Sequence, residues 1–412
     1  MNIPELKAKY ANSEQSGLLV EFLQKNQSGS IYLKGVIGSS IAFISNAVFQ
    51  SQASNMLFIA NDKEEAAYLL NDLESVVGEE NVLFFPASYK KAYHFEDTEN
   101  SNILMRSDLL NILSTSSAPK IIVTYVDALA EKVVNKSVLK KNTLEIAVKE
   151  EYSLEFINEV LYEYGFERED FVIEPGQFSI RGGIIDIFSF SNNQPYRIEF
   201  LGDEIESIRT FDPVSQLSTK NFQKITIIPN LQTGMVVESR ESLIDFMPNS
   251  TVLWCSDIEL TSNLLDNIYS KATTEYKKTE NSPIKRFEPQ FLYLTKDEFI
   301  NQIKNRNTVE FGIQHFFSDS IPINYQQKPQ PEFNKNFTLL YENFLENNKT
   351  GYTNILLTEN SKQAERLHTI FDDIGKEIHV FSLLLPIHQG FIDSDLQICC
   401  YTDHQIFNRY QR

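Results

Sequence analysis

The sequence predicts a multidomain α/β protein. Its 412 residues exceed what one hydrophobic core usually serves, so two to four domains are expected. With 42% hydrophobic and 12% aromatic residues, the chain is predicted to be globular. From residue 30 to about residue 139, short apolar runs alternate with segments of helical periodicity. This alternation is typical of a parallel sheet covered by helices.

The first block, 1–141, supplies buried strands and helices in turn. Short apolar runs predict strands at 30–34, 56–60, 82–85 and 120–124. Apolar residues spaced three and four apart predict helices at 39–50, 62–77 and 100–113. Asp127 follows the last of these strands and suits either the start of a helix or a metal ligand.

The pattern changes after Lys141. One amphipathic helix, 153–164, is followed by four or five strands with glycine and aspartate turns. Block 142–230 is therefore predicted to be a small α+β domain with an antiparallel sheet. Alternating helix and strand signals return in block 231–318, with strands predicted at 251–255, 291–294 and 308–313.

The remainder predicts a linker and a small α/β domain. Stretch 319–336 carries Pro322, Pro329 and Pro331 among Gln and Asn residues and lacks periodicity, so a linker is expected. Block 337–412 then predicts a strand at 352–357, a helix at 361–374 and strands near His379 and Leu396. The last residues carry no stop signal, so we expect a fragment of a longer protein.

Charge and cysteine content narrow the function classes. A formal net charge of -19 opposes the phosphate backbone, so free DNA is not expected as a stand-alone ligand. The three cysteines give neither a disulfide framework nor a zinc spacing, and no histidine is paired at a metal-ligand spacing. We expect no metal, no cofactor and no membrane span, and a reducing cytoplasm fits.

A degenerate phosphate loop is predicted between the first strand and the first helix. Its residues are Gly35, Gly38, Ser39, Ser40, Ile41 and Ala42. Against the GxxxxGK[ST] template, Ser40 replaces the second glycine, Ile41 the lysine and Ala42 the metal-binding hydroxyl. Without these groups the loop lacks a cation for the phosphates and a ligand for magnesium, so ATP hydrolysis is not expected and no catalytic residue is assigned. An ordinary tight turn and the remnant of a nucleotide site both stay open.

The stretch 171–215 contains the candidate protein-binding residues. Arg181 precedes the pair Gly182 and Gly183, and alternation along 196–200 places Arg197 and Glu199 on one face of a strand. Two arginines beside a glycine pair that a partner backbone can approach form a candidate hot spot. The alternative is that both arginines pair with carboxylates of their own domain. The carboxylates considered are Asp186, Glu199, Asp203 and Glu204.

Two segments, EPGQFSIRGGIIDIF and PYRIEFLGDEIESIRTFDP, closely resemble the domain shared by transcription-repair coupling factors and the excision-repair protein UvrB. LKGVIGSSIAF resembles the degenerate nucleotide loop of the coupling factors, and TDHQIF resembles the end of their third domain. The resemblance implies their amino-terminal part, a UvrB-like module split by an α+β insertion and followed by a small domain. A UvrB protein has an intact phosphate loop and a long DNA-threading hairpin, where only 86–99 intervene here.

The resemblance also implies a function in transcription-coupled nucleotide excision repair. In this family the inserted domain binds UvrA, and the contacting positions fall on Arg181, Arg197 and Leu201. Leu201 stands where some members have an aromatic residue, so apolar area remains without a ring. The full-length protein is implied to be an ATP-dependent DNA translocase, whose carboxy-terminal part contacts RNA polymerase and DNA and can mask this domain. The alternatives are a residual ATPase or helicase lobe, a DNA-binding module and a structural spacer.

Overall fold

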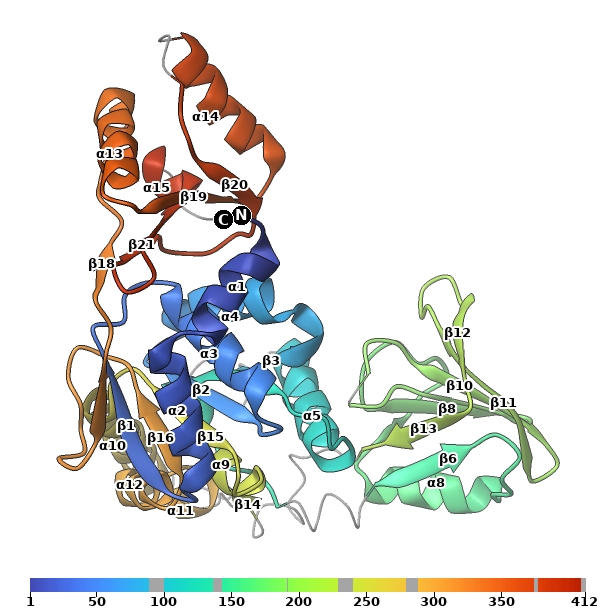
Figure 1. Ribbon diagram of the computed structural model, residues 1–412. Coiled ribbons are helices and arrows are strands. Elements are labelled where there is room, and N and C mark those ends of the chain that lie inside the picture. Colours follow the sequence, from blue (N-terminus) through green and yellow to red (C-terminus); the bar gives the residue numbers. More distant parts are fainter. Residues whose placement is uncertain are drawn as a thin grey trace.

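The computed structural model describes residues 1–88, 100–135, 143–190, 192–228, 240–278, 288–373 and 377–408. Figure 1 shows a parallel-sheet domain in the centre, an α+β domain drawn in green beside it and a small α/β domain drawn in orange and red above it. The α/β multidomain class predicted from the sequence is confirmed.

Seven parallel strands form the central sheet, in the order β17-β1-β16-β15-β2-β4-β3. The interior strands β2, β4 and β15 are buried along their whole length, which explains their uninterrupted apolar sequences. The strand bounds are β1 Gly29–Lys34, β2 Met56–Ala60, β3 Val82–Phe85, β4 Ile121–Tyr125, β15 Val252–Cys255, β16 Asn307–Glu310 and β17 Ile321–Asn324.

The helices of the central domain form two groups. Helix α3 packs against α1, α2 and α4, and helix α10 packs against α6, α11 and α12. Several begin at capping residues, among them Asn2 and Thr295, which both form capping boxes with a glutamate three residues later. The bounds are α1 Ile3–Ala11, α2 Glu14–Lys25, α3 Ser40–Ser51, α4 Lys63–Val77, η1 Glu79–Asn81, α5 Asn100–Thr115, α6 Val126–Ala130, α9 Leu243–Phe246, α10 Ile258–Lys278, α11 Pro289–Leu292 and α12 Lys296–Lys304.

Two predictions from the sequence receive direct answers in this domain. The strand predicted at 291–294 is wrong, because Pro289 starts the short helix α11 and Tyr293 pairs only through an isolated bridge to Glu131. Asp127 lies in the first turn of α6, where a carboxylate faces the positive end of the helix dipole.

The inserted domain folds around its own core. A six-stranded sheet, β12-β11-β10-β9-β8-β7, packs with the helix α8 and with the two-stranded sheet β6-β13. All pairings in the six-stranded sheet are antiparallel except β7 with β8. The bounds are β6 Leu144–Ala147, α8 Leu154–Glu163, β7 Glu167–Arg168, β8 Gln177–Arg181, β9 Ile184–Ile187, β10 Tyr196–Leu201, β11 Glu204–Phe211, β12 Ser218–Phe222 and β13 Lys224–Ile227.

The two ends of the insertion are held together by strand pairing. Strand β6 enters the inserted domain and β13 leaves it, and the two are antiparallel neighbours. On the central side of the junction, β5 Val133–Val134 pairs in the same way with β14 Arg240–Glu241. The insertion therefore returns the chain to the place where it left the central domain.

The segment 319–336, predicted to be a linker, differs from that expectation. Strand β17 forms an edge of the central sheet, and β18 Gln327–Pro329 pairs antiparallel with β21 Phe391–Asp393 in the last domain. Pro322 and Pro329 lie within these strands. Both strands are edge strands, where a proline need not donate a ladder hydrogen bond. The prolines therefore hide the strand signal without preventing the pairing.

The last domain contains a five-stranded sheet in the order β18-β21-β22-β19-β20. Its own core is built around Phe344, Phe371 and Tyr401. The bounds are α13 Phe337–Lys349, β19 Thr353–Thr358, α14 Ser361–Asp373, β20 Phe381–Leu384, β22 Ile398–Thr402 and α15 Asp403–Ile406.

Gly312→Ala is expected to destabilise the central sheet. A Cβ at this position would lie 1.8 Å from the Ser256 carbonyl oxygen, so the backbone after β15 or after β16 would have to move. We expect a loss of about 2 kcal/mol in the free energy of unfolding. The single tryptophan, Trp254, is buried in this sheet, so its fluorescence during urea unfolding reports the change.

Gly17→Ala in α2 is the matched control, because nothing lies within 4 Å of its added Cβ. It is expected to raise the stability by up to about 1 kcal/mol. Equal urea midpoints for Gly312→Ala and the unmodified protein would mean that the two backbone segments do not touch.

Candidate protein-binding site

The polar face of the six-stranded sheet carries the arginines predicted from the sequence. Along β10, Ile198 and Phe200 lie in the domain core, while Arg197, Glu199 and Leu201 alternate to the other face. The strand register places Arg197 directly opposite Asp186 on β9. This part of the arrangement follows from the sequence alternation.

Asp186 binds both arginines. Arg197 donates from Nε and Nη2 to the two oxygens of the Asp186 carboxylate, at 2.7 and 2.8 Å. Arg181 donates from Nη2 to Asp186 Oδ2 at 2.6 Å. The Asp186 side chain is 1% exposed and has lost its hydration. The two guanidinium groups compensate for that loss by pairing with the carboxylate. One buried carboxylate on β9 therefore fixes two guanidinium groups, one on each of the flanking strands β8 and β10.

The two arginines are not equivalent. The Arg197 side chain is only 15% exposed, lies over the Phe211 ring at 4.1 Å and also donates to Gln216 Oε1 at 2.9 Å. The Arg181 side chain is 43% exposed, and its guanidinium lies 5.2 Å from the centre of the Phe171 ring. Pairing with an internal carboxylate, the alternative weighed from the sequence, is thus what the structure contains. Arg197 is largely enclosed and stabilises the sheet, whereas the Arg181 guanidinium is accessible to solvent.

Apolar side chains lie exposed around these charges. Leu201 ends β10, and Gly182 in the turn after β8 has open space around its Cβ position. Gly183 is closer to its neighbours, with the Phe200 carbonyl oxygen 3.0 Å from its Cβ position. The exposed apolar residues in this domain's loops and strand ends include Phe171, Ile173, Leu201, Val214 and Leu217. Of these, sequence reasoning found only Leu201; large apolar residues in the polar turns at 171–173 and 214–217 were the available signal.

A second ion pair completes the polar face. Arg209 Nη1 donates to Glu199 Oε2 at 2.7 Å, and the Ser207 hydroxyl donates to the same oxygen at 2.8 Å. The Arg209 and Ser207 hydrogen bonds lower the pKa of Glu199 to about 2. Glu199 is therefore ionised at neutral pH and keeps Arg209 engaged.

The degenerate phosphate loop (residues 35–42) lies at the carboxyl end of β1 and leads into α3, as the sequence predicts. Its amide groups donate to oxygens of the protein itself. The Ile37 amide donates to Gln327 Oε1 at 2.9 Å, and the Ser39 amide donates to the Gln389 carbonyl at 3.2 Å. Ser40, Ile41 and Ala42 are buried.

A cavity of about 480 Å³ beside this loop is acidic. Four carboxylates contribute to its lining, with Tyr68 and His388 facing one another as stacked rings. The carboxylates are Asp62, Glu64, Glu65 and Asp72. Their charge opposes phosphate binding. Within the described parts of the chain, no group of three or more His, Cys, Asp or Glu side chains is arranged to hold a metal ion.

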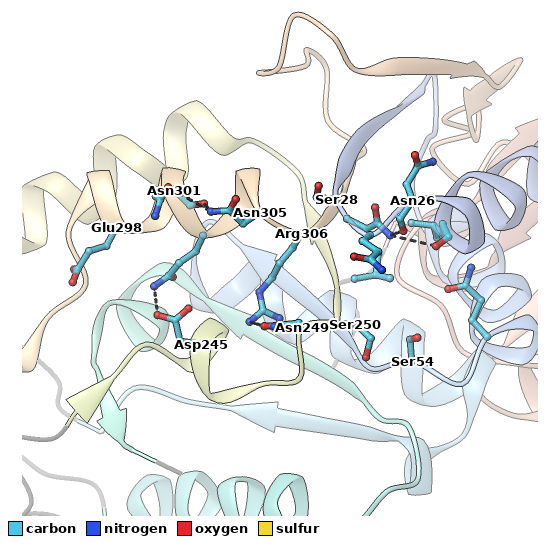
Figure 2. Close-up of a pocket in the computed structure, with 16 residues that line it drawn as sticks. Asn26, Ser28, Ser54, Asp245, Asn249, Ser250, Glu298, Asn301, Asn305 and Arg306 are labelled. Carbon is cyan, nitrogen blue, oxygen red and sulfur yellow. Dashed lines mark hydrogen bonds between the residues drawn. The ribbon is translucent and has the colours of Figure 1, made fainter. Parts of the chain in front are cut away.

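A larger cavity, of about 800 Å³, lies near the amino ends of β1, β15 and β16 (Figure 2). Its lining is rich in amide side chains, and Figure 2 shows Asn301, Asn305 and Asn249 around Arg306. The Arg306 guanidinium donates to the carbonyl groups of Pro248 and Ile244 at 2.6 and 2.7 Å. Among the described residues of this lining it is the one cation, and it stabilises the carboxyl end of α9. Its hydrogen bonds to carbonyl groups occupy it, so the described lining offers no further cation to an anionic ligand.

The comparison with protein families decides what the inserted domain is. Residues 144–232 match the family described as the UvrB interaction domain, starting at the first residue of β6. The inserted domain is similar to a UvrB interaction domain.

The whole chain is similar to transcription-repair-coupling factors, as the resemblance predicted. It is 30% identical to that of Bacillus subtilis over 48% of the chain and 17% of the relative. It is 24% identical to that of Borreliella burgdorferi over the full chain and 39% of the relative. The UvrABC system protein B of Campylobacter hominis is 24% identical over 55% of the chain and 37% of that protein. The chain matches the amino-terminal region of the coupling factors and spans well under half of their length.

None of the helices in the described residues has the length and apolar character needed to cross a membrane.

Arg197→Ala is expected to loosen the inserted domain far more than Arg181→Ala. Without Arg197, the buried Asp186 carboxylate keeps only the half-exposed Arg181, so we expect a loss of about 3 kcal/mol in local stability. Arg181→Ala leaves the bidentate pair in place and is expected to cost about 1 kcal/mol or less. Hydrogen exchange of the β9 and β10 amides measures both changes. Arg168→Ala on β7 is the control, and equal effects of the two main variants would contradict the assigned roles.

The stability of the protein is expected to fall as the pH rises from 5 to 8. Burial raises the pKa of Asp72 to about 7, against weaker opposing hydrogen bonds from Ser39 and the His388 amide. Because the folded-state pKa lies above the unfolded value, the contribution of the neutral carboxyl is complete at low pH and is lost as the pH passes 7. The free energy of unfolding falls by about 1.4 kcal/mol per pH unit between the unfolded and the folded pKa values, so the loss between pH 5 and 8 is on the order of 3 kcal/mol.

Asp72→Asn separates this effect from other titrating groups, because the amide cannot ionise. The groups that face Asp72 or line the same cavity are Asp62, Glu64, Glu65, Tyr68 and His388, with His404 next to His388. Urea midpoints of both proteins between pH 5 and 8.5 provide the comparison. Parallel pH curves would show that Asp72 does not titrate in this range.

Proposed function

We propose that this chain is the recruitment module of a transcription-repair coupling factor. Its UvrB interaction domain binds UvrA and so delivers nucleotide excision repair to stalled RNA polymerase. One observation carries the proposal: the half-exposed Arg181 guanidinium and the exposed Leu201 lie on a domain that matches the UvrB interaction family. The printed names of the relatives, transcription-repair-coupling factor and UvrABC system protein B, support it.

We assign the two arginines different roles in binding. Arg197 satisfies both oxygens of Asp186, so Arg181 can turn toward a partner without leaving that buried carboxylate unpaired. A guanidinium in such a position offers planar, bidentate contacts to a carboxylate on the partner. The exposed Leu201 and Phe171 side chains supply apolar area beside it, and Gly182 leaves room for a partner backbone.

The same proposal assigns no ATP hydrolysis to the degenerate phosphate loop. The loop has Ile41 where the template has lysine, and the neighbouring cavity is acidic. We place the motor and the contacts with RNA polymerase and DNA in the part of the coupling factors that this chain does not match. In an intact coupling factor, another part of the protein could mask the surface around Arg181 and so block UvrA binding.

Arg181→Ala is expected to weaken UvrA binding at least tenfold while leaving the domain folded, because it removes an exposed cation and keeps the Asp186–Arg197 pair. Leu201→Ala is expected to weaken it less, and Leu201→Phe to preserve or strengthen it by adding ring area. Co-migration of each variant with purified UvrA in gel filtration, and titration calorimetry, give the affinities.

Arg168→Ala, on β7 of the same domain, is the matched control for the loss of a positive charge. It is expected to bind UvrA as the unmodified protein does. Unchanged UvrA affinity in both Arg181→Ala and Leu201→Ala would refute the proposed face.

A further inference from the structure

We infer that the degenerate phosphate loop is a docking site for the last domain of the same chain. Oxygen atoms of Gln327 and of the segment 387–390 accept hydrogen bonds from the loop. In an intact phosphate loop, the corresponding donors bind the phosphates of a nucleotide. The inference concerns a different surface from the proposed UvrA-binding face and does not rest on it.

The loop amides carry the first part of the argument. The Ile37 amide and the Ser40 hydroxyl both donate to Gln327 Oε1, at 2.9 and 2.6 Å. Ser39 exchanges two hydrogen bonds with Gln389, one from its own amide to the Gln389 carbonyl and one from the Gln389 amide to its hydroxyl at 2.8 Å. These are donors of the kind that cradle phosphate in an intact loop. Here they are satisfied by amide and carbonyl oxygens of the protein.

The shape of the loop fits a polypeptide. Gly38 has φ +56°, and a Cβ on it would lie 3.0 Å from Gln389 Cβ and 3.3 Å from the carbonyl oxygens of Gln389 and Gly390. The absence of a side chain at this position thus allows the segment 387–390 to approach the loop backbone. The glycine retained within the degenerate loop therefore has a role in this contact.

Polar contacts extend from the loop to both sides. The Asp72 carboxylate on α4 accepts the His388 amide at 2.6 Å, and the Tyr68 and His388 rings stack at 3.5 Å. On the other side, Asp393 Oδ2 accepts hydrogen bonds from Gln327 Nε2 at 2.7 Å and from the Tyr10 hydroxyl at 3.0 Å. Helices α1 and α4 and the loop thus all hold the same edge of the last domain.

The apolar residues make the docking extensive. Leu385, Ile387, Phe391 and Cys400 belong to the core of the central domain, whereas Cys399 and Tyr401 belong to the separate core of the last domain. Alternate residues of β22 therefore face two different cores. Phe391 lies edge-on to Phe43 of α3 at 6.0 Å, so the interface is continuous with the helix that follows the loop. The last domain and the central domain are joined as one unit.

Gln327→Ala in the full chain tests the docking. Gln327 contacts the loop but has no described hydrogen bond to His388 or Gln389, so a cooperative interface predicts faster exchange of those two amides as well. We expect at least a tenfold increase in hydrogen exchange at 387–390 and at 37–40, with no change in β2 and β4. An increase confined to the Ile37 amide would overturn the inference, because it would mean a single local contact.

Gly38→Ala provides an independent variant, and Gly202→Ala is its control. Both glycines have positive φ, but nothing lies within 4 Å of a Cβ at Gly202. Gly38→Ala is expected to raise exchange at 387–390 at least tenfold and to increase the radius of gyration in X-ray scattering, whereas Gly202→Ala changes neither. Unchanged exchange at 387–390 in both Gly38→Ala and Gln327→Ala, or tight binding of magnesium ATP by the unmodified chain, would overturn the docking assignment.

Discussion

The central sheet can form only if the inserted domain returns the chain to the place where the insertion begins. Strands β1 to β4 precede the insertion, and β15 to β17 follow it, yet β15 pairs with β2 and β16 pairs with β1. A displaced exit from the insertion would prevent β15 from reaching β2. The antiparallel pairs β6–β13 and β5–β14 meet this requirement, because each brings the outgoing and the incoming chain side by side. The inserted domain can then have its own core and its own binding face without disturbing the sheet.

That separation shapes the proposed binding face. A buried carboxylate is costly unless it is paired, and Asp186 is paired twice. The pair with Arg197 is enclosed, with Phe211 beneath the guanidinium and Gln216 beside it, so it fixes β9 against β10. The pair with Arg181 is less enclosed, because 43% of the Arg181 side chain is exposed to water. Asp186 thereby both stabilises the sheet, through Arg197, and orients the more exposed guanidinium of Arg181.

The sequence predicted most of the secondary structure, and the reasons for its failures are physical. The interior strand β2 was predicted to the residue because a strand buried on both faces is a continuous apolar run, and the edge strand β3 was predicted to the residue because it too is wholly apolar. The strands in 319–336 were missed because Pro322 and Pro329 are tolerated only at sheet edges, and edge position is a property of the whole sheet.

The candidate site shows the same limit. Alternation along β10 predicted the face that carries Arg197, but the burial of Asp186 depends on the register of β9 with β8 and β10. That register cannot be read from one strand. The contact partner of the degenerate loop could not be predicted from the sequence, because Ser39 and Gln389 are separated by 350 residues. Local pattern identified which template residues the loop lacks, and only the fold shows which oxygen atoms accept hydrogen bonds from it.

The loop also shows how the amide groups at the end of a parallel strand can find acceptors within the same chain. The carboxyl ends of parallel strands leave amide groups exposed at the start of the following helix, and these need acceptors. A nucleotide satisfies them in an active enzyme. In this chain Gln327 and Gln389 satisfy them, and the interface buries Leu385, Ile387 and Phe391 at the same time. An acceptor that belongs to the same chain does not lose the translational entropy that a separate ligand loses on binding, so the geometry of the loop contributes to the stability of the interface.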